Sequence, residues 1–387
     1  MTTTSGSAHL VLVGGGHTHV EVLRVFALRP VPDVRLTIVS RDTHALYSGM
    51  LPGLIAGHYG WNEAHIDLKA LSRKAGAQLV LDEVVGLDAA GGTVRCRSGL
   101  TLAGDLVSLD VGSTPSLSVP GSGRHAIPVK PISALLTRWE AMRARVLAHP
   151  GQVRIAVVGG GAGGVELVLA VQHGLRTAPG GGRPARDLDL HLFTPSLLPA
   201  LNRRARQSLA GILGARGIQI HAGSRVVEVD AGGLRTSDGQ RHALDEVLWV
   251  TEAAAAPWVS ESGVAVNDAG FVRVNETLRS VSHPRVFASG DIASLEGRAL
   301  QKSGVVAVRQ APFLAHNLRH ALAGGRLRRY RPQRHHLALI STGDRHAVAS
   351  RGPWTVQGDW VWRLKDWIDR RFVRRYNDAP GISVGPQ

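Results

Sequence analysis

The sequence predicts an α/β fold, because one pattern of buried strand, glycine-rich loop and helix occurs twice in the chain. The apolar runs His9–Val13 and Arg154–Val158 each precede such a loop, and an amphipathic stretch follows each loop. Short apolar runs bounded by glycine are typical of strands buried in a parallel sheet. A third strand pattern, over 285–288, ends in a Gly-Asp pair. These units together indicate Rossmann-like dinucleotide-binding domains.

Length and composition fit a multidomain globular protein. A chain of 387 residues, 44% of them hydrophobic, is long enough for two or three domains. The net charge of +15 comes mostly from arginine and is interpreted as a compositional bias, so no nucleic-acid partner is expected. The N-terminus lacks a secretory pattern and no stretch is apolar enough to span a membrane, so a cytoplasmic location is expected. Cys96 is the single cysteine, which excludes a redox-active thiol pair.

The first loop holds two of the three glycines of a dinucleotide-binding fingerprint. Gly14 and Gly16 stand where the fold needs a tight turn and a close approach to a pyrophosphate. His19 replaces the third glycine, so its side chain must lean away from the strand or contact the phosphate. His17 and His19 also suggest a metal pair, but no third ligand follows nearby, and no metal site is predicted.

The second strand, Leu36–Val39, lacks the acid that usually binds an adenine ribose. Ser40 stands at that position and can donate or accept one hydrogen bond. Arg41 can stack on an adenine or meet a phosphate. Both residues are therefore predicted to contact the nucleotide.

The segment His283–Asn317 reads as strand, carboxylate, loop and helix. Arg285–Ala288 carries the strand pattern, and Gly290-Asp291 ends it. A helix is expected to begin near Ser303 and Gly304, because serine is a good N-cap and glycine lets a ligand approach the backbone. The free amides and the positive dipole end of that helix would face a bound anion.

This segment resembles the second flavin-binding segment of the glutathione-reductase-like superfamily of FAD/NAD(P)H oxidoreductases, through VFASGD and KSGVVAVRQAPFLAHN. The resemblance implies that Asp291 binds the ribityl chain and pyrophosphate of FAD, beside Gly290, Gly304 and Val305. It also implies two glutathione-reductase-type domains, the second inserted in the first, with a small C-terminal α+β region. The implied boundaries are 1–118 with 263–325 for the FAD domain, 119–262 for the NAD(P)H domain, and 326–387 for the C-terminal region.

Two further stretches, GGGHTHVEVLR and YSGMLPGLIAGHY, narrow the resemblance. They are similar to the flavoprotein domain fused to selenide, water dikinase, and the type II NADH dehydrogenases are the next group. The similarity reaches KDWIDRRF near the C-terminus, but the kinase domain is absent, so no kinase activity is expected. The disulfide reductases of the superfamily carry two redox cysteines in this region, where this chain has Tyr47, Ser48, Gly49, Met50 and Pro52.

The rest of the first domain is expected to hold FAD through its backbone. Gln78–Leu87 reads as one strand at the adenine end, with Val85 as a backbone contact. A small antiparallel hairpin is expected over residues 93–102. Leu106–Pro115 resembles the A-T-G segment that leaves this domain, where Gly112 lets the chain pass close to FAD.

The second loop carries the complete fingerprint, with Gly159, Gly161 and Gly164 in the G-x-G-x-x-G pattern, and predicts an NAD(P)H site. Glu166 follows on the first turn of the next helix. One interpretation is an acid that complements the helix N-terminus. The other, implied by the resemblance, is a group near the nicotinamide or quinone side of the flavin.

The strand after this helix ends at Thr194, which is predicted to contact the nucleotide, and again no acid follows for an adenine ribose. Its absence permits NADPH as well as NADH. Glu252 replaces the glycine that is typical of the segment leaving the second domain. These departures also fit a decayed nicotinamide site, which would make the protein a flavin-binding sensor or scaffold.

The C-terminal region is expected to hold two or three strands followed by an amphipathic helix over 358–377. His335 and His336 are placed on a strand, where adjacent side chains point apart and do not suit one metal. The apolar face of the helix comprises Trp360, Val361, Leu364, Trp367, Ile368 and Phe372, and the arginines opposite are Arg363, Arg370 and Arg374. Such a helix fits peripheral contact with the inner face of a membrane, or docking on the core or on a partner subunit.

The resemblance implies an FAD-dependent oxidoreductase that takes hydride from NAD(P)H and passes electrons on directly, because no cysteine pair is present. A quinone is the first expected acceptor, and a selenium or sulfur species is the second. Glu166, Lys302 and Lys130 are the predicted catalytic residues, and Gln310 is expected with Lys302 near the acceptor. The alternative for Lys130 is a solvated side chain before a proline turn.

Overall fold

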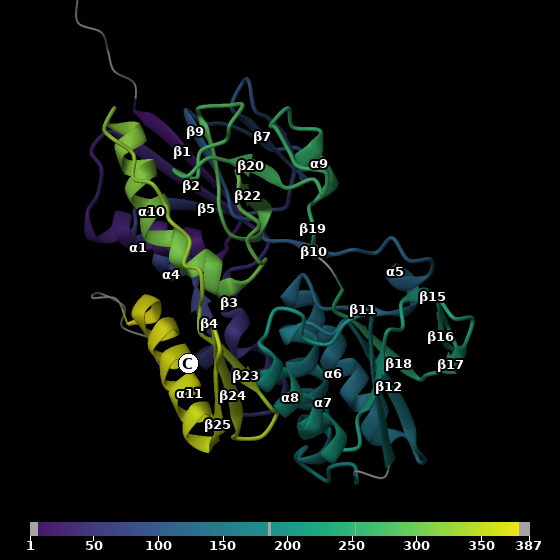
Figure 1. The fold of residues 1–387 in the computed structure, drawn as a ribbon. Coiled ribbons are helices and arrows are strands. Elements are labelled where there is room, and N and C mark those ends of the chain that lie inside the picture. The colour runs from purple at the N-terminus through teal and green to yellow at the C-terminus, as the bar shows by residue number, and fades with distance from the viewer. Residues whose placement is uncertain (1–6, 185–186, 252, 379–387) are drawn as a thin grey trace, which may run out of the picture.

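The computed structural model describes residues 7–184, 187–251 and 253–378 (Figure 1). Its first sheet is parallel, with the strand order β21-β9-β1-β2-β5. The strands are β1 (Ala8–Val13), β2 (Val34–Ser40), β5 (Ala77–Leu81), β9 (Leu106–Leu109) and β21 (Val286–Ala288). β21 lies far from the others in the sequence, so the first domain is built from two separate segments of the chain.

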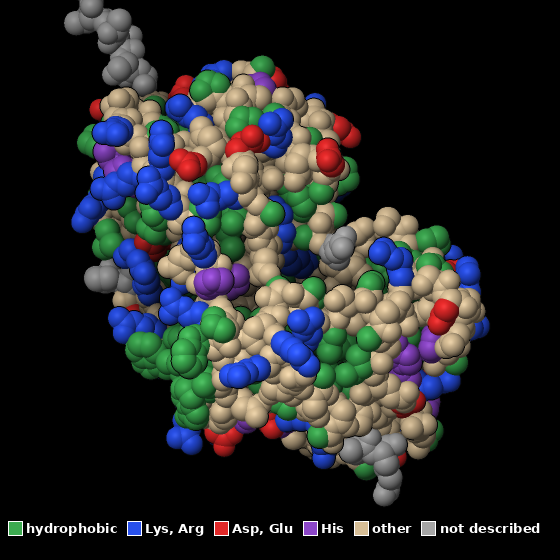
Figure 2. Space-filling view, in the orientation of Figure 1, with side chains coloured by type: hydrophobic (Ala, Val, Ile, Leu, Met, Phe, Trp, Pro, Cys, Tyr) green, Lys and Arg blue, Asp and Glu red, His purple; other side chains and the backbone are tan. Residues whose placement is uncertain are grey.

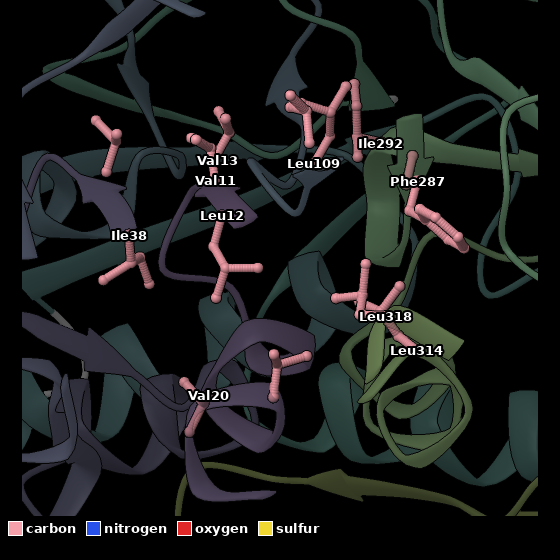
Figure 3. Packing of buried hydrophobic residues seen from close by; sticks show 14 of the residues in the cluster. Val11, Leu12, Val13, Val20, Ile38, Leu109, Phe287, Ile292, Leu314 and Leu318 are labelled. Atoms are coloured by element: carbon pink, nitrogen blue, oxygen red, sulfur yellow. The ribbon is translucent and has the colours of Figure 1, made fainter. Parts of the chain in front are cut away.

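Three helices and a small sheet enclose the first sheet. Helix α1 (His17–Leu28) packs against α4 (Leu68–Lys74) and α10 (Gly304–Leu322). Figure 3 shows Leu12 of β1 pointing toward these helices, and Leu314 of α10 pointing back toward the sheet. The antiparallel strands β6 (Val84–Asp88), β7 (Thr93–Cys96) and β8 (Thr101–Ala103) share the same core.

The second domain repeats this plan. Its parallel sheet has the order β11-β18-β12-β13-β14, formed by β11 (Ile127–Pro128), β12 (Val153–Val158), β13 (Leu188–Thr194), β14 (Gln219–Ala222) and β18 (Glu246–Trp249). Helices α6 (Ile132–Ala148), α7 (Ala162–Arg176) and α8 (Arg203–Ala215) contribute to one core with it. The strands β15 (Val226–Asp230) and β16 (Gly233–Thr236) contribute to another, and β17 (Arg241–Ala243) pairs with β16.

Short elements connect the two domains and complete both of them. The chain crosses between them at β10 (Thr114–Pro115) and β19 (Ala253–Ala254), which pair antiparallel. The others are β3 (His44–Leu46), α2 (Leu51–Ile55), α3 (Trp61–Ala64), β4 (His65–Asp67), α5 (Ser122–His125), α9 (Pro257–Ser260), β20 (Val272–Val274) and β22 (Ala293–Leu295), with 3-10 turns at Ser48–Met50 and Gly290–Ile292.

The structure confirms the expected α/β class and most of the expected elements. β1, β2, β12, β13 and β21 lie where the apolar runs place them, and Cys96 is buried in β7. The expected single strand Gln78–Leu87 is wrong, because the chain turns at Asp82-Glu83 and divides it into β5 and β6. The strand expected at His335-His336 is also wrong, since the next strand begins at Ala338.

The C-terminal region connects the two domains. Its antiparallel sheet, β23 (Ala338–Ser341), β24 (Ala347–Arg351) and β25 (Trp354–Gly358), lies against the second domain, where the Asn202 amide donates to the carbonyl of Gly352 at 2.9 Å. Helix α11 (Asp359–Asn377) lies against the first domain, where the Asn377 amide donates to the His65 carbonyl at 2.8 Å. Figure 1 shows this region as the yellow layer beside both domains.

The expected single apolar face of α11 is divided in the structure. Val361 is buried and Phe372 is half-buried, but Trp360 and Trp367 are 55% and 56% exposed. The side of the helix that faces the protein buries two charged residues instead, Lys365 and Asp369. The alternative of docking on the protein's own core is therefore confirmed for one side of α11, while an exposed apolar strip remains.

The buried ammonium of Lys365 is expected to stabilise the fold. It donates to Asp369 Oδ2 at 2.6 Å and to the Gly49 carbonyl at 2.7 Å, and its side chain is 9% exposed. Removing one member of a buried pair leaves the other charge unpaired and costs about 3–5 kcal/mol. Lys365→Ala should lower the free energy of unfolding by this amount in denaturant titrations. The control Arg363→Ala, on the exposed side of the same helix, should change it by less than about 0.5 kcal/mol. Equal effects of the two substitutions would contradict this role.

Candidate functional site

A single large cavity of about 2090 Å³ extends between the two domains and beneath the C-terminal region. Figure 2 shows the molecule hollowed between its upper and lower lobes. Both glycine-rich loops open into the cavity, as do the start of α10 and the first residues of α7. The predicted residues that line it are Gly14, Gly16, Ser40, Arg41, Gly112, Lys130, Gly161, Glu166, Gly290, Asp291, Lys302, Gly304 and Val305.

The first loop is held against the end of β9. Gly14 has a φ of +96°, and a Cβ there would lie 2.4 Å from the carbonyl oxygen of Asp110. His19 does not line the cavity, because its side chain is buried inside the domain. Its Nδ1 lies 2.7 Å from the Gly14 carbonyl and its Nε2 lies 2.8 Å from Ser108 Oγ. Of the two expected outcomes for His19, the structure shows the one without phosphate contact, and the side chain fixes the loop instead.

Asp110 is a site residue that the sequence reasoning missed. Its carboxylate accepts hydrogen bonds from the backbone amides of Thr18 at 2.8 Å and His19 at 3.0 Å, at the start of α1. The sequence did contain a signal for Asp110, because an acidic residue is unusual in the segment that resembles A-T-G. Val85 does not line the cavity, whereas the neighbouring Val84 and Asp82 do, and its backbone contact with FAD stays a prediction.

Asp291 and Lys130 form an ion pair on the cavity wall. The Lys130 ammonium lies 2.7 Å from Asp291 Oδ2, and Ser113 Oγ donates to the same oxygen at 2.9 Å. Burial favours the neutral acid, but the charge and hydrogen bond of Lys130 hold the pKa of Asp291 below its usual value. Asp291 is therefore an anion at neutral pH, ready to accept hydrogen bonds from hydroxyl groups. The solvated alternative for Lys130 is not what the structure shows.

The start of α10 leaves polar groups unused. Ser303 occupies the N-cap position as expected, but its hydroxyl makes no capping hydrogen bond and is buried without a partner. A Cβ at Gly304 would lie 2.8 Å from Ser48 Oγ, so glycine is needed where the two segments meet. An unpartnered hydroxyl beside a helix N-terminus in a cavity wall fits a polar, electron-rich ligand edge.

The second loop uses its three glycines in different ways. Gly161 lines the cavity, whereas Gly159 and Gly164 close the loop. A Cβ at Gly164 would lie 1.8 Å from the Gly159 carbonyl oxygen. Thr194 does not line the cavity, because its hydroxyl donates to the Ser196 carbonyl and packs against Gly160. The lining at this point comes from 198–202 instead. Glu252 lies outside the described residues.

A largely buried polar cluster adjoins α7 and α11, with half-buried Glu166 and Tyr47 beside buried Asp369. Glu166, in the second turn of α7, accepts a hydrogen bond from the Ser341 amide at 2.8 Å. Burial raises the pKa of Glu166 to about 7, although the charge of Lys365 opposes the shift. Burial also raises the pKa of Tyr47, whose hydroxyl is hydrogen-bonded to Asp369. The Tyr47 ring stacks on Phe372 with a centroid separation of 4.3 Å.

The remaining predicted residues separate into two groups. Lys302 lines the cavity and donates to the Ala293 carbonyl at 2.7 Å, and burial lowers its pKa to about 8. Gln310 does not line the cavity. Its side-chain oxygen accepts from the Gly290 amide at 2.7 Å, so it supports the turn that precedes Asp291. His335 and His336 line the cavity, but no group of metal ligands occurs among the described residues.

Comparisons with known proteins agree with this architecture. Residues 8–317 match the family model of the pyridine nucleotide-disulphide oxidoreductases. The chain is 26% identical over 362 residues to the type II NADH:quinone oxidoreductase Ndh of Mycobacterium tuberculosis, covering 86% of this chain and 78% of that protein. It is 25% identical over 325 residues to the alternative NAD(P)H-ubiquinone oxidoreductase C1 of Arabidopsis thaliana, covering 73% and 61%. The solved sulfide:quinone oxidoreductase of Aquifex aeolicus superposes with a TM-score of 0.78 at 17% identity, covering 96% and 92%.

These findings confirm the superfamily predicted from the sequence and its cofactors, FAD and NAD(P)H. The first domain fits FAD on three observations of its own: the glycine cradle at Gly14, the anionic Asp291 and the unpartnered Ser303 hydroxyl. The narrower resemblance to the domain fused to selenide, water dikinase stays a prediction.

Asp291 is expected to be needed for FAD retention. A charge-assisted hydrogen bond is worth roughly 1.5–3 kcal/mol, so Asp291→Ala should weaken FAD binding by about 10- to 150-fold. The exposed carboxylate of Asp238, which accepts from Thr236 and Gln240 in a hairpin of the second domain, supplies the matched control Asp238→Ala. FAD content of the purified variants, measured by absorbance after denaturation, checks the prediction. Full flavin occupancy in the Asp291 variant on dilution would refute this assignment.

Proposed function

The chain belongs to the pyridine nucleotide-disulphide oxidoreductase family, and from this premise we propose that it transfers electrons from NAD(P)H to a quinone without a redox-active disulfide. The observation that carries the proposal is a polar cluster on the cavity wall, formed by half-buried Glu166 with buried Lys365 and Asp369. In the disulfide reductases of the family, cysteines follow the second strand, where this chain has Tyr47 and Ser48.

The names of two relatives support the choice of acceptor, since both are quinone oxidoreductases of NADH or NAD(P)H. The cavity walls support it independently. Reduction of a quinone by two electrons requires two protons, and a carboxyl group with a pKa of about 7 can hold and release a proton at neutral pH. Glu166 is therefore assigned as the proton-holding residue, and Lys365 as the cation that limits the rise of its pKa.

The protein's own groups bind and orient the reactants. FAD, when bound, supplies the electron transfer between nicotinamide and acceptor. Asp291 accepts hydrogen bonds from hydroxyl groups, and the loop at Gly161 faces the second nucleotide. The stacked rings of Tyr47 and Phe372 provide an aromatic part of the wall of the same cavity. The lack of an acid near Thr194 leaves room for the phosphate of NADPH, so both nicotinamide nucleotides are proposed as donors.

A peripheral membrane contact is part of the same proposal, because quinones dissolve in lipid. Trp354, Val356, Trp360, Leu364 and Trp367 of β25 and α11 are all exposed apolar residues. Figure 2 shows hydrophobic side chains gathered at the lower left of the molecule, next to Lys and Arg side chains. Apolar insertion beside cations favours an anionic lipid surface. No helix of the described ranges is long and apolar enough to cross a bilayer.

Stopped-flow measurement of the two half-reactions tests the proposed function. NADH and NADPH should each reduce the bound flavin, and a short-chain ubiquinone should reoxidise it. Glu166→Gln should leave reduction by the nucleotide largely unchanged and slow reoxidation by about 10²–10⁴-fold. Because Glu166 gives up its proton as pH rises through about 7, the wild-type reoxidation rate should fall over that range. The variant should lose this dependence.

The matched control is Glu140→Gln, whose carboxylate is 59% exposed on α6, and it should behave as wild type. Failure of both nucleotides to reduce the flavin would favour the sensor or scaffold alternative. Rapid reduction followed by normal reoxidation in the Glu166 variant would remove Glu166 from the proposal.

The exposed strip on α11 should determine vesicle binding. The double substitution Trp360→Gln with Trp367→Gln should weaken co-sedimentation with phosphatidylglycerol vesicles by about tenfold or more, since apolar burial contributes about 25 cal/mol per Å². Leu100→Gln, at an exposed apolar residue between β7 and β8, is the control and should bind as wild type. High salt should release the wild-type protein. Unchanged binding of the double variant at low salt would argue against this surface.

A further inference from the structure

The carboxyl group of Asp110 occupies an unusual place in the first nucleotide loop. Its Oδ2 accepts hydrogen bonds from the amides of Thr18 and His19, two of the first free amides of α1. The free amides at such a helix start are also the groups that favour a bound phosphate. Asp110 lines the cavity beside this loop, so the carboxyl group and a diphosphate would share one positive helix end.

Three glycines from two distant segments lie so close to Asp110 that a side chain at any of them would collide with it. A Cβ at Gly16 would lie 2.4 Å from Asp110 Oδ2, and a Cβ at Gly290 would lie 2.6 Å from Oδ1. A Cβ at Gly14 would lie 2.4 Å from the backbone carbonyl oxygen of Asp110. The first loop and the turn before Asp291 are therefore both fitted to Asp110, which makes it a built part of the site.

The surroundings of Asp110 contain no cation that compensates its charge. Asp110 is 3% exposed, and no lysine or arginine of the described chain forms an ion pair with it. Burial lowers the pKa values of both neighbouring histidines, that of His19 to about 4, so His17 and His19 are neutral at pH 7. The nearest lysine on the wall, Lys130, is paired with Asp291. Burial raises the pKa of Asp110 itself to about 6, against the hydrogen bonds from α1.

We propose that Asp110 takes up one proton from solvent when the diphosphate of FAD binds at the first loop, so that FAD affinity decreases as pH rises above neutrality. A carboxylate beside a diphosphate repels it, whereas a neutral carboxylic acid can donate a hydrogen bond to a phosphate oxygen. The inference rests on the FAD assignment of the first domain and does not depend on the electron acceptor.

The sign of the pH dependence follows from linkage. In the free protein, Asp110 loses its proton as pH rises through about 6. Adding the negative charge of a diphosphate raises the pKa further in the complex. Between these two values each FAD binds with one proton, so the dissociation constant increases about tenfold for each pH unit. Below the lower value both states are protonated, and the dissociation constant is constant.

The test measures FAD dissociation from the holoprotein. The holoprotein is diluted at constant ionic strength between pH 5.5 and 8.5, and free FAD is quantified after ultrafiltration. The wild type should show a slope of log Kd against pH that approaches one. Asp110→Asn should show no slope and should bind FAD more tightly than wild type at pH 8, because the amide oxygen still accepts from Thr18 and His19 without a charge.

His17→Asn is the control for the nearest other titratable side chain, and it should keep the wild-type slope. If Asp110→Asn does not fold, Asp110→Thr replaces it, since its hydroxyl also offers the α1 amides an acceptor. A flat wild-type profile, or a slope that survives in the neutral variant, overturns the inference while leaving FAD binding intact. A purified protein without FAD would instead contradict the cofactor assignment itself.

Discussion

The buried ammonium of Lys365 connects all three parts of the molecule. It donates to Gly49 of the first domain and to Asp369 of its own helix, and its charge acts on Glu166 of the second domain. A buried lysine is tolerated only where such partners offset the loss of water. These contacts bring the first domain, the C-terminal helix and the wall of the cavity at Glu166 together around one charge. The C-terminal helix is therefore part of the site as well as of the outer surface.

Some carboxyl groups that line the cavity are paired with a cation, and others are not. Asp291 is paired with Lys130 and stays ionised, so it can hold hydroxyl groups. Asp110 is buried and Glu166 is half-buried, both without a direct ion pair in the described part of the chain, and both have pKa values near the physiological range. In the proposed function these two carboxyl groups serve different steps, Glu166 at the electron acceptor and Asp110 at the diphosphate of FAD. Burial alone thus gives one cavity two groups that can exchange protons at neutral pH.

Local sequence patterns predicted the strands, loops and helices whose structure is determined by residues close together in the sequence. Apolar runs located the central strands, and the spacing of glycines located both loops, because a close backbone approach admits no side chain. The helix at Gly304 followed from the same reasoning. The FAD contact of Asp291 is implied by the family resemblance and stays a prediction. Residues that act through distant contacts were missed. Asp110 hydrogen-bonds to α1, His19 to Ser108 and Lys365 to Gly49, and these pairs come together only when the chain has folded. The helical wheel of α11 failed for the same reason, since the protein-facing side buries an ion pair that hydrophobicity does not indicate.

We propose that this protein accepts electrons from a nicotinamide nucleotide and delivers them to a quinone without a redox-active cysteine pair. An anaerobic titration of the holoprotein tests it most directly. One equivalent of NADH or NADPH is added, the flavin spectrum is recorded, and a short-chain ubiquinone is then added in small portions. The account predicts loss of the oxidised flavin spectrum, followed by its full return after one equivalent of quinone. A flavin that neither nucleotide reduces, or a reduced flavin that quinone leaves unchanged, would contradict it.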